Sequence, residues 1–291
     1  MAGEPKRRVQ DDPVETAADA DADAGTTTGT GTSTGTGAAV GVGFRSLLRR
    51  EILRFVRRPY NTFLPPIITN TLYFSVFGVI LGNRIGEIAG VSYLQFVLPG
   101  LVVLGAISDS FENASFSIFH GRWNDYIQTV VTSPLSDRSM LGAYVVASAL
   151  RGVVTSLLIV GVGLVFTSVP LANPAYLVAF LSVITVLFGG LGVIGGLWAD
   201  DFDYLTVMNQ FILRPLVFFG AVFYSLEILP PVWRTVSLLN PMVYMVNGVR
   251  YGMIGVTELD PNTSLAVLTA AAAAVVALDY ALFRRGYGLS D

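Results

Sequence analysis

Nearly all of the chain after residue 43 consists of apolar segments long enough to cross a lipid bilayer. A helix of about 20 apolar residues spans the hydrocarbon core, and the sequence contains six candidate spans, at about 62–82, 93–116, 140–168, 175–199, 207–225 and 264–283. Charged residues make up 13% of the chain, compared with about 25% in soluble domains. The sequence therefore predicts an all-α membrane protein with six transmembrane helices and no large soluble domain.

The first 43 residues have a different composition. They hold seven acidic and three basic side chains, and a Gly-Thr repeat between Gly25 and Gly37. Such a segment cannot bury enough apolar surface to offset the entropy lost on ordering. We expect residues 1–43 to be a disordered, acidic, Gly/Thr-rich cytoplasmic tail. The transmembrane domain then covers residues 44–285, and residues 286–291 are a short cytoplasmic C-terminus.

Residues 44–58 predict an amphipathic helix that lies in the membrane interface. Six apolar side chains fall on one helical face and six arginines take most of the remainder. A solvated basic helix is the alternative, but it would leave the apolar stripe in water. Because arginines gather on the cytoplasmic side of membrane proteins, this end lies inside, and six spans return the C-terminus to the same side. Only three arginines after residue 43 then lie outside: Arg84, Arg234 and Arg250.

Some ionisable residues fall within the predicted spans, where they are costly and usually face the bundle interior or water. Asp109 and Glu112 are three residues apart, so they share a helix face, and Arg151 on the next span can neutralise one of them. Two interpretations are open for these three residues. They line a transport path, or they form an ion pair between helices. Asp279, near the cytoplasmic end of the last span, is expected to be structural.

Missing residue types exclude several kinds of chemistry. The chain has no cysteine and one histidine, His120, so disulfides, thiolate catalysis and Cys- or His-rich metal sites are excluded. Neither HExxH nor GxSxG occurs, which argues against an intramembrane enzyme. A P-loop needs a lysine at the nucleotide phosphates, and the only lysine is Lys6 in the tail. We expect a chain that binds no cofactor and does not hydrolyse ATP itself.

Two connections are not simple loops. In residues 120–140, Trp123, Tyr126, Ile127 and Val130 recur at helical spacing. They predict a short amphipathic cytoplasmic helix that docks on a partner or, alternatively, lies on the membrane surface.

In the external residues 226–262, Asn240-Pro241 is typical of a helix start. The segment 242–255 is too short to span at about 1.5 Å per residue, so it should enter the membrane and turn back. Asn262 begins a glycosylation sequon.

A set of C-terminal residues resembles a known family. Leu229-Pro230, Trp233, Asn240-Pro241, Tyr244 and Arg250 follow a Phe/Gly-rich fifth span. Together they resemble the signature of the ABC-2 type transporter permeases, which include the export subunits of the daunorubicin-resistance and nodulation types. Residues 132–136, Thr-Ser-Pro-Leu-Ser, are similar to the segment after that family's cytoplasmic coupling helix. The resemblance covers about residues 44–285, and its external re-entrant motif comprises Pro230, Trp233, Asn240, Pro241, Tyr244 and Arg250.

The resemblance implies the membrane subunit of an ATP-binding cassette exporter in the cell membrane. Such a subunit forms a homodimer and binds a separate ATPase that holds ATP-Mg. It moves an amphipathic, drug-like, lipid or glycan-linked substrate outward, and it binds membrane lipid but no nucleic acid. Residues 121–132 would be the coupling helix, although the family's acidic and Gly-Thr residues are not clearly present there. Contacts to the ATPase would come from Arg122, Trp123, Asn124, Asp125, Tyr126 and Thr129.

A second class of function uses the same intramembrane charges differently. In an ion-coupled secondary transporter, Asp109, Glu112 and Arg151 would be the coupling groups. Transporters of that class are commonly built from inverted repeats, and no such repeat is evident between the two halves of this sequence. The sequence therefore favours the ATP-driven permease.

Overall fold

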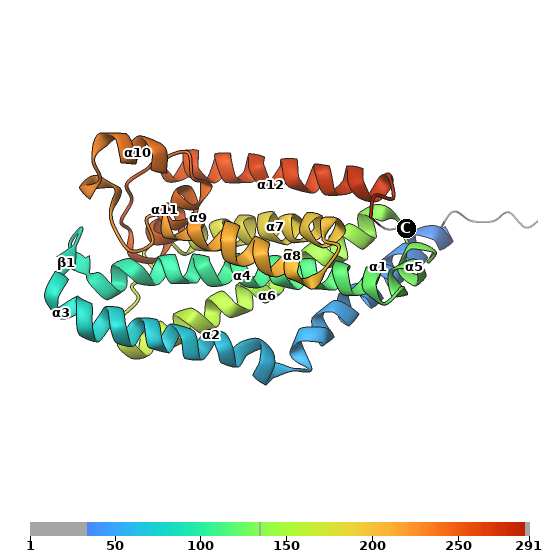
Figure 1. The fold of residues 1–291 in the computed structure, drawn as a ribbon, viewed down its shortest axis with the longest axis horizontal. Helices are drawn as coiled ribbons and strands as arrows, with labels where there is room; N and C mark the ends of the chain where they lie inside the picture. Colours follow the sequence, from blue (N-terminus) through green and yellow to red (C-terminus); the bar gives the residue numbers. More distant parts are fainter. Residues whose placement is uncertain (1–33, 134, 289–291) are drawn as a thin grey trace, which may run out of the picture.

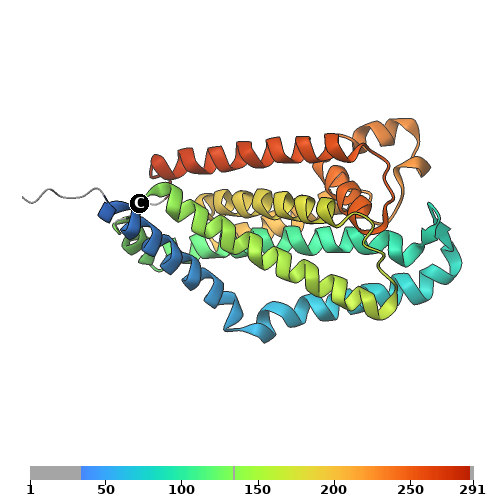
Figure 2. The same ribbon diagram turned by 180° about the vertical axis from the view of Figure 1, so that it is seen from behind.

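The computed structural model describes residues 34–133 and 135–288, and most of these residues are helical (Figure 1). The long helices run roughly along the long axis of the molecule in both views (Figure 2). The helices are α1 Thr34–Val56, α2 Pro59–Phe74, α3 Gly82–Ile85, α4 Tyr93–Trp123, α5 Tyr126–Val131, α6 Asp137–Phe166, α7 Pro174–Trp198, α8 Phe202–Val207, α9 Arg214–Phe218, α10 Pro231–Ser237, α11 Pro241–Ile254 and α12 Pro261–Arg284.

Several short elements join these helices. The π-helical segment η1 (Ser75–Leu81) connects α2 to α3, and η2 (Met208–Leu213) connects α8 to α9. A 3-10 turn, η3 (Leu226–Ile228), precedes α10. Strands β1 (Glu87–Ile88) and β2 (Val91–Ser92) pair antiparallel, with Glu87 opposite Ser92. Ser92 then caps α4. Its side-chain hydroxyl accepts a hydrogen bond from the backbone N–H of Gln95, and the side chain of Gln95 accepts one from the backbone N–H of Ser92.

Four helices in the described part of the chain are long and apolar enough to cross a membrane: α4, α6, α7 and α12. They confirm an all-α membrane protein. The two other predicted spans correspond to α2–η1–α3 and α8–η2–α9, in which π-helical segments interrupt the α-helix. The sequence pattern did not indicate these interruptions, because a π-helical segment leaves the apolar composition of a span unchanged.

The first helix begins earlier than predicted. Residues 34–43 were expected to belong to the disordered tail, but they form the first turns of α1. Residues 38–42 are Ala, Val and Gly, and the strong helix propensity of alanine extends the helix back from its amphipathic part. Residues 1–33, where the rest of the tail was predicted, lie outside the described residues. So do residues 289–291.

Helix α4 lies in the middle of the bundle and packs against α6 and α7, with α12 on the far side of α7 (Figures 1 and 2). Two glycines of α7 allow its backbone to approach α4 closely. A Cβ atom on Gly192 would lie 2.5 Å from the carbonyl oxygen of Phe111, and one on Gly196 would lie 2.6 Å from that of Ser115. Small residues at such contacts are typical of helix packing in membranes.

The two ends of the bundle differ. Helices α1 and α5 lie at the same end as the C-terminus of the chain, whereas the β hairpin, α10 and α11 lie at the opposite end (Figure 1). In the predicted orientation these are the cytoplasmic and external ends.

The close approach of α4 and α7 predicts that Gly192→Ala destabilises the protein. The added methyl group must push the two backbones apart, which costs about 1–3 kcal/mol. The measurement is the thermal unfolding midpoint of the purified protein in detergent. Gly161→Ala on α6 is the matched control, since a Cβ atom there meets nothing within 4 Å. Equal midpoints for the two variants would contradict this account of the packing.

Candidate functional site

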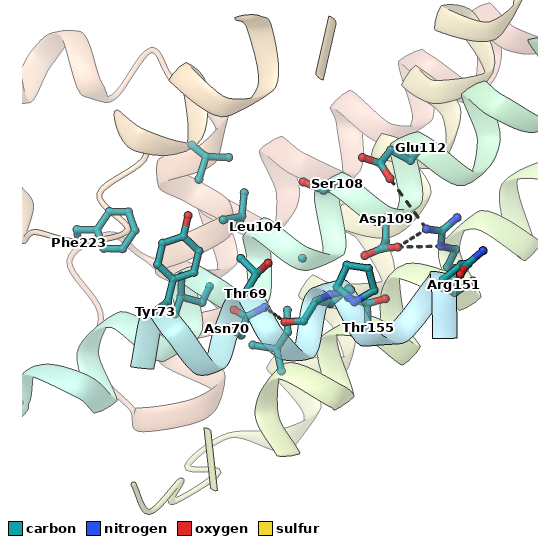
Figure 3. Close-up of a pocket in the computed structure, with 18 residues that line it drawn as sticks. Thr69, Asn70, Tyr73, Leu104, Ser108, Asp109, Glu112, Arg151, Thr155 and Phe223 are labelled. Atoms are coloured by element: carbon teal, nitrogen blue, oxygen red, sulfur yellow. Dashed lines mark hydrogen bonds and ion pairs between the residues drawn. The ribbon is translucent and has the colours of Figure 1, made fainter. Parts of the chain in front are cut away.

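A cavity of about 640 Å³ lies between α2, α4, α6 and the segment from α9 to Phe223 (Figure 3). Polar side chains line it from three helices: Asn61, Thr62, Thr69 and Asn70 from α2, Ser108, Asp109 and Glu112 from α4, and Arg151 and Thr155 from α6. The apolar and aromatic lining is formed by Tyr73, Leu101, Leu104, Ile159, Val217 and Phe223, with Pro65 and Pro66. The cavity therefore combines apolar walls with a small number of ionisable groups.

The prolines shape the α2 wall of the cavity. Pro65 and Pro66 lie inside α2 and carry no N–H group, so they cannot donate the helical hydrogen bonds to the carbonyl oxygens of Asn61 and Thr62. One turn further on, the side-chain amide of Asn70 donates to the carbonyl oxygen of Pro66 at 2.8 Å. This stretch of α2 thus presents hydrogen-bond acceptors on a helix that remains continuous.

Asp109, Glu112 and Arg151 meet in the cavity (Figure 3). Arg151 donates from Nη2 and Nε to the same oxygen of Asp109, at 2.7 and 2.8 Å, and its Nη2 lies 4.0 Å from Glu112. Asn209 of η2 donates to the other oxygen of Glu112 at 2.8 Å. The structure thus contains the ion pair that the sequence suggested between the second and third spans, and it extends the cluster to η2.

A second charged cluster, around Glu51, joins α1 to the bundle. The Glu51 carboxylate is buried and lies 3.0 Å from Arg50 and 3.3 Å from Arg54, and it accepts a hydrogen bond from Ser117 of α4. Arg54 also donates to the backbone and side-chain oxygens of Asn113, at 2.8 and 3.0 Å. The charged side chains of α1 therefore hold it against α4.

Sequence reasoning missed Glu51, although a signal was present. Glu51 is the one acidic residue among six arginines in residues 44–58. It is also four residues from both Leu47 and Phe55, so helical spacing places it in the middle of the apolar stripe. A carboxylate in that position needs buried partners, and its neighbouring arginines provide them.

The predicted coupling helix is two helices. Helix α4 continues to Trp123, the chain turns at Asn124 and Asp125, where Asp125 has a φ of 57°, and α5 begins at Tyr126. Ile127 and Val130 of α5 face inward, in a buried cluster with Leu47 of α1 and Ile118 of α4. The apolar face that was predicted to dock on a partner is therefore used within the chain.

The six predicted ATPase contacts divide into two groups. Trp123, Asn124, Asp125 and Thr129 are exposed, whereas Arg122 and Tyr126 make contacts within the chain. The guanidinium of Arg122 donates to three carbonyl oxygens at the end of α7, at 2.7 to 3.1 Å, and so caps that helix. The Tyr126 ring lies 5.3 Å from the guanidinium of Arg50. We define the four exposed residues as the coupling surface.

At the external end, α11 begins at Pro241 with Asn240 as its cap, which accepts from the backbone N–H of Met242 at 3.0 Å. The side chain of Asn240 also donates to the carbonyl oxygen of Leu216 at 2.7 Å, and the Tyr244 hydroxyl donates to that of Leu238 at 3.0 Å. Three of the six motif residues therefore act locally around the start of α11. Pro230 occupies the N-cap position of α10, and Trp233 lies exposed on that helix. These two residues therefore take no part in the contacts around the start of α11.

Arg250, the remaining motif residue, is buried in the bundle. Its guanidinium donates to the carbonyl oxygen of Ala221 at 2.8 Å, lies 3.9 Å from Glu258 and sits 3.8 Å above the ring of Phe96. It therefore ties α11 to the loop after α9 and to α4. Sequence reasoning missed its acidic partner, because Glu258 lies eight residues further on and beyond the end of α11.

Asp279 is also more deeply buried than its predicted place near the cytoplasmic interface suggested. It lies against Gly190 of α7, and its carboxylate has no hydrogen-bond partner among the described residues. The side chain of Arg214, the one charged residue in the sequence of the predicted fifth span, lies outside the described side chains.

Comparison with known proteins decides the family. The sequence model of the family described as "ABC-2 type transporter" matches residues 42–254. The chain belongs to the ABC-2 type transporter family. It is 35% identical over 245 residues to the "Inner membrane transport permease YadH" of Escherichia coli (strain K12), covering 84% of this chain and 96% of that protein. It is 23% identical over 219 residues to "Nodulation protein J" of Rhizobium leguminosarum bv. viciae, covering 72% and 82%.

Family membership confirms the resemblance seen in the sequence. This ABC-2 transporter is a multi-pass protein of the cell membrane and a transport permease. Family members are transmembrane subunits that work with separate ATPase subunits. The helical bundle and its cavity are therefore those of a transport permease.

The Asp109–Arg151 pair predicts a non-additive effect on stability. Arg151→Ala should lower the stability by about 3 kcal/mol, because it leaves a buried carboxylate without its partner. Asp109→Asn in the same chain should restore most of this loss, whereas Glu112→Gln should restore less because Glu112 lies farther from the guanidinium. The measurement is a double-mutant cycle of thermal unfolding midpoints in detergent. Equal behaviour of the two double variants would sink the assignment of Asp109 as the main partner.

The cluster around Glu51 predicts that Glu51→Gln loosens α1 from the bundle. The expected loss of stability is about 1–3 kcal/mol, which is modest for a buried pair because both guanidinium groups are partly exposed. Limited proteolysis at the arginines of α1, alongside the unfolding midpoint, reports the change. Glu87→Gln, on the exposed β hairpin, is the control and should leave both readouts unaltered. An unaltered Glu51→Gln variant would refute the anchoring role.

Proposed function

We propose that this chain is the membrane subunit of an ATP-driven exporter, with ATP-Mg bound by a separate ATP-binding cassette subunit. The cavity between α2, α4, α6 and α9 forms part of the substrate path, and the polar residues Asp109, Glu112 and Arg151 lie in its wall. The observation that carries the proposal is this cavity, with apolar walls and a few charges, in a chain of the ABC-2 family. The substrate is amphipathic, in the broad class of drug-like, lipid or glycan-linked molecules.

Six membrane crossings follow if the two interrupted helices also span. The helical stretch from Pro59 to Ile85 contains 27 residues, or about 40 Å at 1.5 Å per residue, which exceeds the hydrocarbon thickness. The stretch from Phe202 to Phe218 is shorter and completes a crossing with the residues around it. The resulting topology places both termini and α5 in the cytoplasm, and α11 enters from outside and returns.

The coupling surface supports docking of the ATPase. Trp123, Asn124, Asp125 and Thr129 are exposed at the cytoplasmic end, on segments whose inner faces pack against α1 and α4. Binding of a partner there acts directly on those two helices.

Large apolar side chains also remain exposed on α2 and η2, such as Leu72 and Phe211. These surfaces are available to a second copy of the chain in a homodimer.

The test of this function is purification of the tagged protein from its native membrane in mild detergent, followed by an ATPase assay. A stoichiometric P-loop ATPase in the complex, with vanadate-sensitive hydrolysis, is the expected result. A stable complex that contains no ATPase, combined with transport that fails when the proton gradient is dissipated, would instead favour an ion-coupled transporter.

The coupling surface predicts that Trp123→Ala weakens binding of the ATPase. Large aromatic side chains commonly dominate interface energies, and truncating one should lower the affinity by about tenfold or more. The measurement is the amount of ATPase retained by the tagged protein, together with ATP-dependent transport. Trp233→Ala is the matched control, because both tryptophans are 59% exposed, and α10, which carries Trp233, lies at the opposite end of the molecule from α5, which follows Trp123 (Figure 1). Equal ATPase retention by the two variants would exclude Trp123 from the interface.

A further inference from the structure

Gln210 is exposed on η2, in the middle of the predicted fifth span, and its side chain makes no hydrogen bond with any described residue. An amide that faces hydrocarbon leaves its polar groups unsatisfied, which is costly. We propose that two copies of the chain pack α2 of each against α8 and η2 of the other, and that Gln210 of the partner subunit meets Thr69. This inference rests on the proposed function, in which the permease is a homodimer.

Thr69 is the matching polar residue on α2. It is exposed and lies in the wall of the cavity (Figure 3). Thr71 of the same helix donates to the carbonyl oxygen of Ile67 at 2.8 Å, whereas the hydroxyl of Thr69 has no hydrogen-bond partner in the described part of the chain. Hydroxyl and amide side chains on facing helices commonly bond to each other in membranes. Thr69 is therefore suited to contact the amide of a second copy.

Exposed apolar side chains lie beside both polar residues. On α2, Leu64, Ile68 and Leu72 are 45 to 61% exposed, and on α8 and η2, Val207 and Phe211 are 48% and 74% exposed. Residues four apart share a helix face, so each segment carries an apolar stripe with a polar side chain next to it. A surface that faced only lipid would have no use for these polar groups, whereas a contact between helices pairs them.

The two stripes begin at clusters of opposite charge. Arg57 and Arg58 precede α2, and Asp200, Asp201 and Asp203 lie at the start of α8. All five side chains are exposed, and none of them forms an ion pair within residues 34–133 and 135–288. Packing of α2 against α8 of a second copy brings the two clusters together, and such complementary charges fix the register of an interface.

A two-fold axis along the bundle satisfies these pairings together. Helices α2 and α9 line the same cavity, and α8 and α9 lie in front of α7 in Figure 1 and behind it in Figure 2. A two-fold interface uses the same surface of both copies. Thr69 follows Arg58 by eleven residues and Gln210 follows Asp201 by nine, or about 16 and 14 Å at 1.5 Å per residue. The polar and charged contacts are thus in register, and the second copy covers the cavity.

The absence of cysteine from the chain makes this contact directly testable. The full-length double variant Thr69→Cys/Gln210→Cys is oxidised with copper phenanthroline in its native membrane and run on a non-reducing gel. A dimer band that a reductant removes is the expected result, and each single variant should remain monomeric. Thr69→Cys/Val267→Cys is the control, because Val267 is exposed to a similar degree but lies on α12. No cross-link in the first variant, or equal cross-linking in the control, would overturn the proposal.

Reversal of the charges tests the second contact. Arg57→Glu/Arg58→Glu should weaken dimerisation by about tenfold, measured by energy transfer between copies fused to two fluorescent proteins and diluted with lipid. Adding Asp201→Arg/Asp203→Arg in the same chain should restore it. Arg49→Glu, on the exposed face of α1, should dimerise as the unaltered protein does. Loss without restoration would refute the charge pairing, and if the reversed variants fail to fold on gel filtration, the cross-linking result decides.

The outcomes separate this inference from the proposed function. An ATPase that co-purifies with a protein whose Thr69 and Gln210 positions do not cross-link would leave the ABC permease intact and refute this interface. A specific cross-link in a protein that brings no ATPase with it would support the interface and count against the ATP-driven mechanism.

Discussion

A charge inside a membrane-spanning bundle needs an opposite charge or several hydrogen bonds close by, because lipid supplies neither. Among the described residues, three pairings meet that need, and each also joins separate parts of the chain. Asp109 and Arg151 connect α4 to α6, Glu51 and Arg54 connect α1 to α4, and Arg250 connects α11 to the loops on either side of it. The charges thus hold helices together where apolar packing alone has no advantage over contact with lipid.

The two sides of the bundle are held in different ways. On one side, α4, α7 and α12 pack closely, and glycines of α7 bring backbones within van der Waals contact. On the other side, α1 is joined to α4 by polar side chains, and α2 carries two prolines before it passes into the π-helical η1. The cavity lies on this second side. The substrate path proposed for this cavity therefore lies beside a helix whose regular hydrogen bonding is interrupted.

Patterns within single segments were mostly predicted, whereas contacts between segments, apart from the pairing of Arg151 with the carboxylates of α4, were not. The start of α11 at Asn240-Pro241 followed from capping preferences, and the shared face of Asp109 and Glu112 followed from their spacing. The inward face of α5 was misassigned because Ile127 and Val130 are apolar in either setting, and only the position of α1 shows that they are covered within the chain. Likewise, Arg122 caps the end of α7 at carbonyl oxygens 74 to 77 residues further along the chain, which no local pattern reveals.

The structure shows which of the intramembrane charges form the ion pair. A sequence shows that Asp109 and Glu112 share a face, but not which of them approaches Arg151 more closely. Asp109 lies 2.7 Å from Arg151 and so joins α4 to α6, whereas Glu112 lies 4.0 Å from Arg151 and accepts a hydrogen bond from Asn209 of η2. The two carboxylates of one helix face therefore contact different neighbours of α4, on α6 and η2, and both lie in the wall of the cavity.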